Sequence, residues 1–186
     1  LLNSGELGEI LHSHASFHIH LPVTKTRNIR FQPEAGGGAL WDLGCYAVDL
    51  TGRVFEAFPK EVSASTRIEN GIDTSFTGYL KYDGARSAVI ECSFYGPRRE
   101  GLQIVGTHGT LQIPRPFKGE ARETWVLTTA DGGNKEIAVT SDVNPYQKQF
   151  RNFHRVIRGE AELLMPPAAS LRNARTIEAL LTAAAR

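Results

Sequence analysis

Residues 36–50 read GGGALWDLGCYAVDL, which is three glycines followed by an amphipathic helical pattern. Apolar side chains recur every three or four residues, at Leu40, Leu43, Ala47, Leu50 and Val54. Polar side chains recur at the same spacing, at Asp42, Tyr46, Asp49 and Arg53. Two such stripes lie side by side on one helix. We therefore predict a helix over residues 39–57 that packs one stripe on a core and presents the other.

Asp42 and Tyr46 are the pair in this helix where we place the chemistry. They lie four residues apart, so their Cβ atoms are about 5–6 Å from each other. Gly44 stands between them, although a glycine inside a helix costs about 1 kcal/mol relative to alanine. A close approach to the backbone explains such a glycine. The approaching group is either a ligand, which makes Gly44 a candidate binding residue, or a neighbouring strand.

A loop over residues 22–38 precedes the helix and supplies two further candidates, Asn28 and Arg30. A loop arginine beside the polar face of a helix can hold an anionic or polyhydroxyl ligand. A solvated surface arginine is the alternative. We predict both residues as substrate contacts.

The composition indicates one globular domain. The chain has 186 residues, is 41% hydrophobic and 22% charged, and carries a net charge of +1. This balance argues against a nucleic-acid or membrane surface, and no apolar run approaches the ~18 residues of a transmembrane helix. Two cysteines and no signal-peptide pattern predict a cytoplasmic protein with reduced thiols. The absence of a first Met indicates a fragment or an excised domain.

Residues 12–23 alternate and predict a strand. Four histidines occupy even positions on its face, at His12, His14, His18 and His20. At ~3.3 Å per residue, the outer two are ~26 Å apart and cannot share an ion. We expect a polar, partly solvated sheet face and no metal site.

Residues 60–140 alternate in successive runs joined by turn signals such as Asn70-Gly71 and Asp83-Gly84, which favour hairpins. Two helical segments follow, over residues 145–159 and after Ser170. The first has a predicted core stripe at Phe150, Phe153, Val156 and Ile157. The fold class is therefore α+β, an open and mostly antiparallel sheet with helices on one face. We predict that the other face is partly apolar, at Phe76, Val89 and Phe94, and that it forms a homo-oligomer.

Several motifs are missing from the sequence. It has no GxGxxG after a strand, no GxxxxGK phosphate loop, no GxSxG elbow and no CxxC pair. The chain therefore does not carry its own nucleotide-binding domain.

The sequence resembles the C-terminal domain of the glucose–fructose oxidoreductase / inositol dehydrogenase / MocA family. The resemblance rests on Asn28-Ile29-Arg30, on the run GGG-x-x-x-D-x-G-x-[HY]-x-x-D, on GTHGTLQIPRPF at 106–117 and on the tail from Gln149. It covers essentially the whole chain, which we assign as one C-terminal α/β domain over residues 1–186. Members of the family pair this domain with a Rossmann domain that binds NAD or NADP. That domain and its catalytic lysine are absent from this sequence.

The resemblance implies roles for particular residues. Asp42 matches the active-site aspartate of the family, and Tyr46 matches a position that is histidine or tyrosine. Arg30 matches a position that often lines the pocket, and we treat Asp49 as structural. The implied function is the substrate-binding and oligomerisation domain of an NAD(P)-dependent oxidoreductase for a sugar or polyol, as a homodimer or tetramer. The alternative is a non-catalytic binding or assembly module with the same fold.

Overall fold

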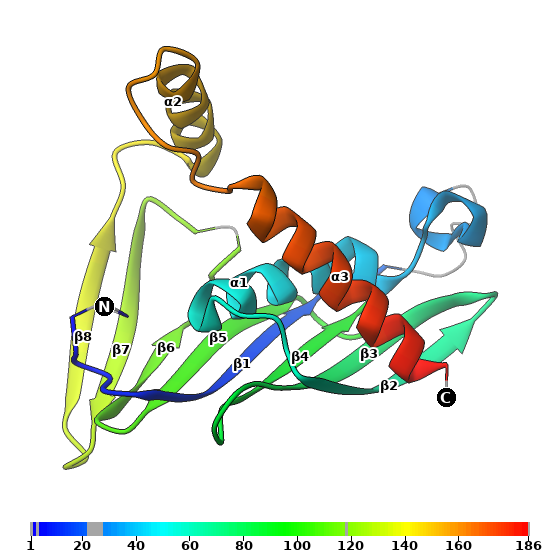
Figure 1. Ribbon diagram of the computed structural model, residues 1–186, viewed down its shortest axis with the longest axis horizontal. Helices are drawn as coiled ribbons and strands as arrows, with labels where there is room; N and C mark the ends of the chain where they lie inside the picture. Colours follow the sequence, from blue (N-terminus) through cyan, green and yellow to red (C-terminus); the bar gives the residue numbers. More distant parts are fainter. Residues whose placement is uncertain (1, 3, 22–27, 118, 186) are drawn as a thin grey trace.

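The computed structural model describes residues 2, 4–21, 28–117 and 119–185. Its centre is one sheet of eight strands in the order β2-β3-β4-β1-β5-β6-β7-β8 (Figure 1). The strands are β1 (Ile10–His18), β2 (Glu61–Glu69), β3 (Ile72–Lys81), β4 (Ser87–Ser93), β5 (Arg99–Gly106), β6 (Gly109–Ile113), β7 (Arg122–Thr129) and β8 (Asn134–Thr140). The predicted α+β class with an open sheet is confirmed.

The pairing of the strands is antiparallel with one exception. Among the described strands, β1 pairs with β4 in parallel, and the other six pairings are antiparallel. The hairpin between β2 and β3 turns at Asn70 and Gly71, both with positive φ, as the dipeptide predicts. A loop connects β1 to the helix that contains Asp42 and Tyr46. It includes residues 22–27, which the structure does not describe.

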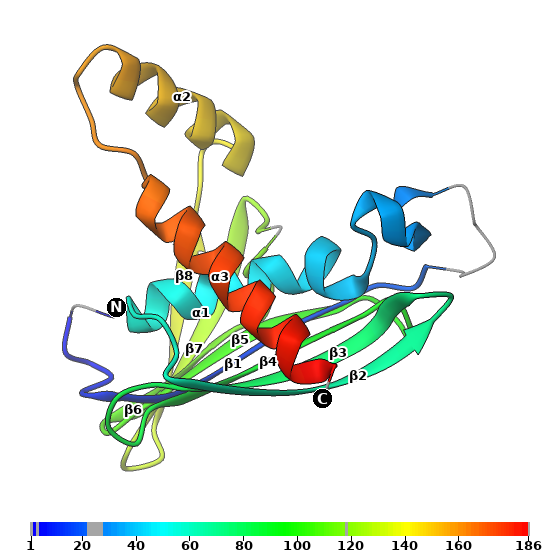
Figure 2. The ribbon, with the colours of Figure 1, turned by 45° about the vertical axis from the view of Figure 1, so that its right-hand side comes forward.

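Helices cover one face of the sheet, here called the inner face. α1 (Cys45–Phe55) packs on β1 and β4, and α3 (Pro167–Ala184) packs on β2 and on α1 (Figure 2). Between them and the sheet lies a core that includes the buried side chains of Leu40, Ala47, Phe55, Phe76, Ile90, Phe94 and Leu180. In the described part of the chain, no helix is long and apolar enough to cross a membrane.

Three predictions about burial need correction. Phe76 and Phe94 do not lie on an open face, because both are fully buried in the core. Within the site helix the buried positions include Val48, Thr51 and Phe55, while Leu50 and Val54 are only partly buried. The buried face is rotated toward α3, since a Cβ on Gly52 would lie 3.2 Å from Arg172 Nε on that helix.

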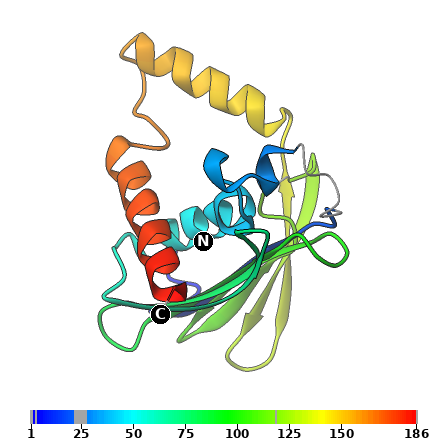
Figure 3. The same ribbon diagram turned by 90° about the vertical axis from the view of Figure 1, so that its right-hand side faces the viewer.

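The third correction concerns α2 (Pro145–Ile157), whose apolar stripe is not part of the core. None of its residues is buried, and Phe150 and Phe153 are 74% and 56% exposed. α2 stands away from the sheet, at the end of the connection from β8 (Figure 3). The core is closed by α1 and α3, and among the described residues none covers the apolar face of α2.

The predicted helix over 39–57 begins differently from expectation. Its first turn is a π-helix, η3 (Leu40–Gly44), which continues directly as α1. Two short 3-10 turns precede it, η1 (Ile29–Phe31) and η2 (Pro33–Ala35). Single π-turns inside helices are frequent at functional sites, and this one holds Asp42.

Candidate active site

An ion pair between Arg30 and Asp42 forms the centre of the candidate site. Arg30 Nε donates to Asp42 Oδ2 at 2.7 Å, from η1 to η3. The side chains are 42% and 22% exposed, so that both can be reached by a ligand. A guanidinium has several donors and a carboxylate has several acceptor positions, so the pair can still bind hydroxyl groups.

Asn28 contributes to the site through the backbone of Arg30. It caps η1, and its Oδ1 accepts a hydrogen bond from the Arg30 N–H at 3.1 Å. This bond fixes the turn that presents the guanidinium. A direct substrate contact of Asn28 remains a prediction.

Tyr46 lies at the start of α1 with its ring 49% exposed. Its ring meets the edge of Phe17 at a centroid distance of 5.6 Å and also contacts Phe117 at 5.7 Å. Phe17 and Phe117 stack on each other at 4.8 Å. Together the three rings form an aromatic platform, the name used below for Phe17, Tyr46 and Phe117.

The sequence did not single out Phe17 or Phe117 as site residues. Phe17 has an inward-facing position on β1. Phe117 follows β6 and lies 100 positions after Phe17 in the chain. Alternation shows which face of a strand such residues occupy, but strand order decides which of them meet.

The pKa of Tyr46 is raised above its ordinary value. Burial is the main cause, and Cys45, Asp42 and Tyr146 add to it, whereas Arg30 acts in the opposite direction. The phenol therefore keeps its proton at neutral pH. To accept a proton from a substrate, it needs a further positive charge nearby.

Gly44 faces the sheet. It is buried, and a Cβ at this position would lie 2.7 Å from Leu40 Cδ1 and 3.0 Å from Cys92 Sγ on β4. Of the two explanations for this glycine, the structure supports contact with a strand. We therefore do not propose Gly44 as a binding residue.

Asp49 lies further along the helix and connects two elements. Its carboxylate accepts hydrogen bonds from Arg53 Nε at 2.8 Å and from Asn173 Nδ2 at 2.8 Å. Since Asn173 belongs to α3, Asp49 ties α3 to α1. This is the structural role expected for it.

The histidines of β1 form the expected polar surface on the outer face of the sheet. His12 contacts Ser87 Oγ at 2.9 Å, and His14 contacts Glu91 Oε2 at 2.9 Å. His20 lies beyond the end of β1. Within the described residues, no three His, Cys, Asp or Glu side chains gather as ligands for a metal.

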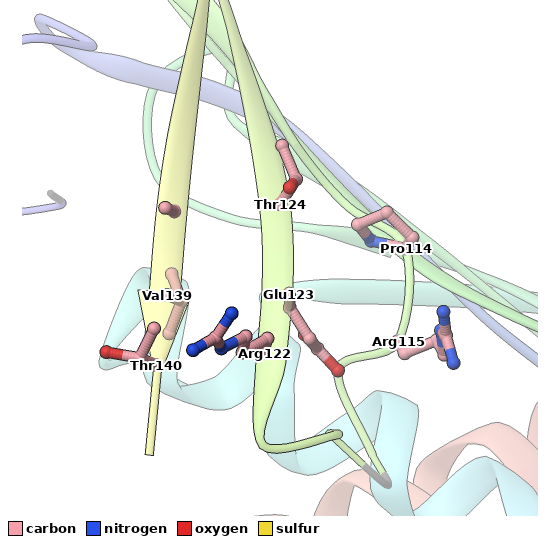
Figure 4. Close-up of a pocket in the computed structure, with 8 residues that line it drawn as sticks. Pro114, Arg115, Arg122, Glu123, Thr124, Val139 and Thr140 are labelled. Carbon is pink, nitrogen blue, oxygen red and sulfur yellow. The ribbon is translucent and has the colours of Figure 1, made fainter.

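The surface has hollows away from the ion pair. One of about 500 Å³ lies over β7 and β8, where Arg122 and Glu123 leave β7 in different directions (Figure 4). Another, of about 470 Å³, includes Phe117 and Trp125. The second adjoins the aromatic platform through Phe117, whereas the first contains none of the predicted site residues.

The fold and the candidate site define a class of domain: an open α+β sheet whose inner-face helix carries a partly exposed carboxylate, Asp42, and a half-exposed phenol, Tyr46. The chain belongs to the GFO/IDH/MocA family, because residues 1–112 match the GFO/IDH/MocA C-terminal domain.

Relatives with assigned names are oxidoreductases. The D-xylose 1-dehydrogenase (NADP(+)) 2 of Haloferax volcanii is 29% identical over 185 residues, covering 98% of this chain and 56% of its own length. The trans-1,2-dihydrobenzene-1,2-diol dehydrogenase of Xenopus tropicalis is 33% identical over 116 residues, covering 61% of this chain and 34% of its own.

A solved structure confirms the fold. The 3-ketoreductase KijD10 from Actinomadura kijaniata, in complex with NADP and TDP-benzene, superposes with a TM-score of 0.86 at 25% identity. The match covers 98% of this chain and 56% of the ketoreductase. The chain thus spans little more than half the length of these relatives.

Proposed function

We propose that this chain is the substrate-binding and oligomerisation domain of an NAD(P)-dependent oxidoreductase for a sugar, polyol or related hydroxy compound. Membership of the family and the names of its relatives support this proposal. The observation that carries it is the half-exposed phenol of Tyr46 on the helix whose first turn holds Asp42, the partner of Arg30. The two free cysteines are compatible with the reducing cytoplasm, the location that we propose.

The cofactor belongs, in this proposal, to a second domain. The sequence has no dinucleotide fingerprint, and it spans 56% of the length of the xylose dehydrogenase. We place the cofactor domain against the exposed apolar side of α2, which carries Tyr146, Phe150, Phe153 and Ile157. Tyr146 acts electrostatically on Tyr46, so the first turn of α2 lies near the site. A domain that reaches Tyr46 can therefore follow α2 for its ~20 Å length.

NAD or NADP, when bound, supplies the acceptor for a hydride from the substrate carbon. Tyr46 takes the proton of the hydroxyl on that carbon, acting as general base. Its raised pKa means that this step needs a cation, which the family's lysine on the cofactor domain would supply. Arg30 and Asp42 orient hydroxyls of the substrate by charge-assisted hydrogen bonds.

The aromatic platform suggests the shape of the substrate. A small ring presents apolar C–H groups on its faces and hydroxyls at its edge. The platform suits such a face, and the Arg30–Asp42 pair suits adjacent hydroxyls. The names of the two dehydrogenases, for D-xylose and for a dihydrobenzene diol, are consistent with a ring that carries neighbouring hydroxyls.

A second copy of the chain is the proposed occupant of the outer face of the sheet. Within the described residues, helices pack only on the inner face (Figure 2). On the outer face Tyr79 is 44% exposed and lies opposite Val89 on the neighbouring strand. A sheet face that no described helix covers, with such side chains on β3 and β4, suits a symmetric dimer.

Substitution of the phenol tests the proposed chemistry. In the longer oxidoreductase that contains this domain, Tyr46→Phe should lower kcat by about 10²–10⁴-fold, the usual contribution of a general base. Turnover would be followed as NAD(P)H absorbance across a panel of sugars and polyols. Tyr79→Phe, on the outer face, is the matched control and should retain activity.

Two results would contradict the proposal in different ways. An active enzyme whose Tyr46→Phe variant turns over normally would remove Tyr46 from the mechanism. A wild-type protein that binds sugars and oxidises none of them would favour the non-catalytic binding module.

A further inference from the structure

The N-terminal end of the site helix is anchored by a buried carboxylate from another part of the chain. Asp73 lies on β3 and is 6% exposed. Its Oδ2 accepts a hydrogen bond from the Leu40 N–H at 2.6 Å, and the Ala39 N–H also donates to the carboxylate. The carboxylate therefore binds the free N–H groups at the positive end of η3, where an anion is favoured.

The same turn joins the backbones of Arg30 and Asp42. The Gly38 N–H donates to the Arg30 carbonyl at 3.0 Å, and the Asp42 N–H donates to the Gly38 carbonyl at 3.1 Å. Gly38 has a φ of 126°, and a Cβ there would lie 2.0 Å from Asp73 Oδ1. Asp73 thus packs against Gly38, whose backbone is hydrogen-bonded to both residues of the ion pair.

We propose that Asp73 is the positioning residue of the candidate site: it fixes the Gly38–Leu40 turn and thereby the placement of Arg30 against Asp42. An effect of this role on turnover rests on the proposed function. The positioning of Arg30 and Asp42 by Asp73 does not depend on that function. We did not predict Asp73 as a site residue from the sequence, although an acidic residue beside inward-facing apolar positions of a strand is a signal of a buried partner.

The ionisation of Asp73 makes this role measurable. Burial raises its pKa to about 6, although the backbone donors of Ala39 and Leu40 oppose the shift. Cys92 on the neighbouring strand β4 interacts electrostatically with Asp73, and burial holds the pKa of its thiol well above its usual range. Cys92 therefore stays neutral, and we assign a transition between pH 5 and 7 at this turn to Asp73, an assignment that Asp73→Asn tests.

The experiment is NMR on the 186-residue chain without substrate or cofactor. The Leu40 amide and the Arg30 Nε–H should shift together between pH 5 and 7 in the wild type. Asp73→Asn, which keeps an acceptor oxygen, should abolish this titration and keep a hydrogen-bonded Arg30 signal. Asp73→Leu, which has no acceptor, should lose that signal while the amides of Ile104 and Leu127 show an intact sheet.

A control on the same helix separates positioning from general stability. Asp49→Asn perturbs a carboxylate that binds Arg53 and Asn173, and it should leave the Arg30 signal in place. If Asp73→Leu does not fold, the titration of the wild type and its loss in Asp73→Asn still test the positioning role of Asp73. An Arg30 Nε–H that neither titrates nor responds to substitution of Asp73 would overturn the proposal.

Kinetics of the longer oxidoreductase provide the second readout. A displacement of a catalytic group by ~1 Å can lower the rate by about 100-fold. Asp73→Leu should therefore lower kcat/KM by about that factor. Asp73→Asn should recover most of the loss. An inactive wild type with titrating Leu40 and Arg30 signals would refute the proposed oxidoreductase function and support the anchor.

Discussion

Arg30 and Asp42 matter through their geometry, because an ion pair that water can reach contributes little to folding. Partly exposed pairs are typically worth less than about 1 kcal/mol. The pair is instead held from both sides, by the cap of Asn28 on η1 and by the turn at Gly38. The backbone therefore fixes the distance, and the side chains remain free to bind a ligand.

Arg30→Ala should accordingly change binding and leave stability nearly unaltered. We expect a loss of less than about 1 kcal/mol in the free energy of unfolding, since the pair is partly exposed. KM for the substrate of the longer enzyme should rise by at least about tenfold, since a charge-assisted hydrogen bond is worth ~1.5–3 kcal/mol. Chemical denaturation and steady-state kinetics measure the two effects.

Arg53→Ala is the matched control for this substitution. Arg53 binds Asp49 at 2.8 Å through the same atoms, Nε and Oδ2, and is similarly exposed. It should lose as little stability as Arg30→Ala and leave KM unchanged. Equal effects of the two substitutions on KM would exclude a specific role for Arg30.

In helix α2 the sequence pattern, an apolar stripe, differs most from the environment of the side chains in the structure. Its apolar stripe is real, yet Phe150 and Phe153 face water within this chain. The double substitution Phe150→Ser/Phe153→Ser should therefore change the stability of this chain by no more than about 0.5 kcal/mol. Phe76→Ala, in the core, should cost ~3–5 kcal/mol.

The proposed cofactor domain predicts a different result in the longer protein. There the two serines would face a buried interface, and the melting temperature should fall clearly below that of the unsubstituted protein. Scanning calorimetry of both lengths makes the comparison. A longer protein that tolerates the substitutions as well as this chain does would show that α2 has no such neighbour.

Particular elements show what a sequence can specify. The extent of β2, Glu61–Glu69, coincides with the alternating run EVSASTRIE, and Asn70-Gly71 marks its hairpin, because both signals are local. The location of Asp42 and Tyr46 on one continuous helix, η3 running into α1, was predictable for the same reason. The contact of Phe17 with Phe117 was not, since it depends on strand order. Periodicity showed that α2 has an apolar face, but it cannot show what covers that face.

In the described part of the molecule, helices cover the inner face of the sheet and leave the outer face open. If a second copy covers the outer face, Tyr79→Arg/Val89→Arg should convert an oligomer into a monomer, because the two positions are directly opposed and would bring four like charges together in a dimer. Light scattering coupled to size exclusion measures the mass. Tyr146→Arg, on α2, is the control and should leave the assembly intact. A wild-type chain that is monomeric at high concentration would rule out this interface.

The parallel pairing of β1 with β4 has a consequence for how the chain reaches its native state. β1 precedes the other described strands of this sheet along the chain, yet His12 pairs with Ser87 on one side and with Val105 on the other. The middle of the sheet cannot close until nearly a hundred further residues have left the ribosome. Such distant pairings make folding slow, because a long loop must be closed before any contact rewards it. During synthesis, both edges of β1 therefore stay unpaired until β4 and β5 have been made. In this interval β1 can bind a chaperone or pair with a wrong strand.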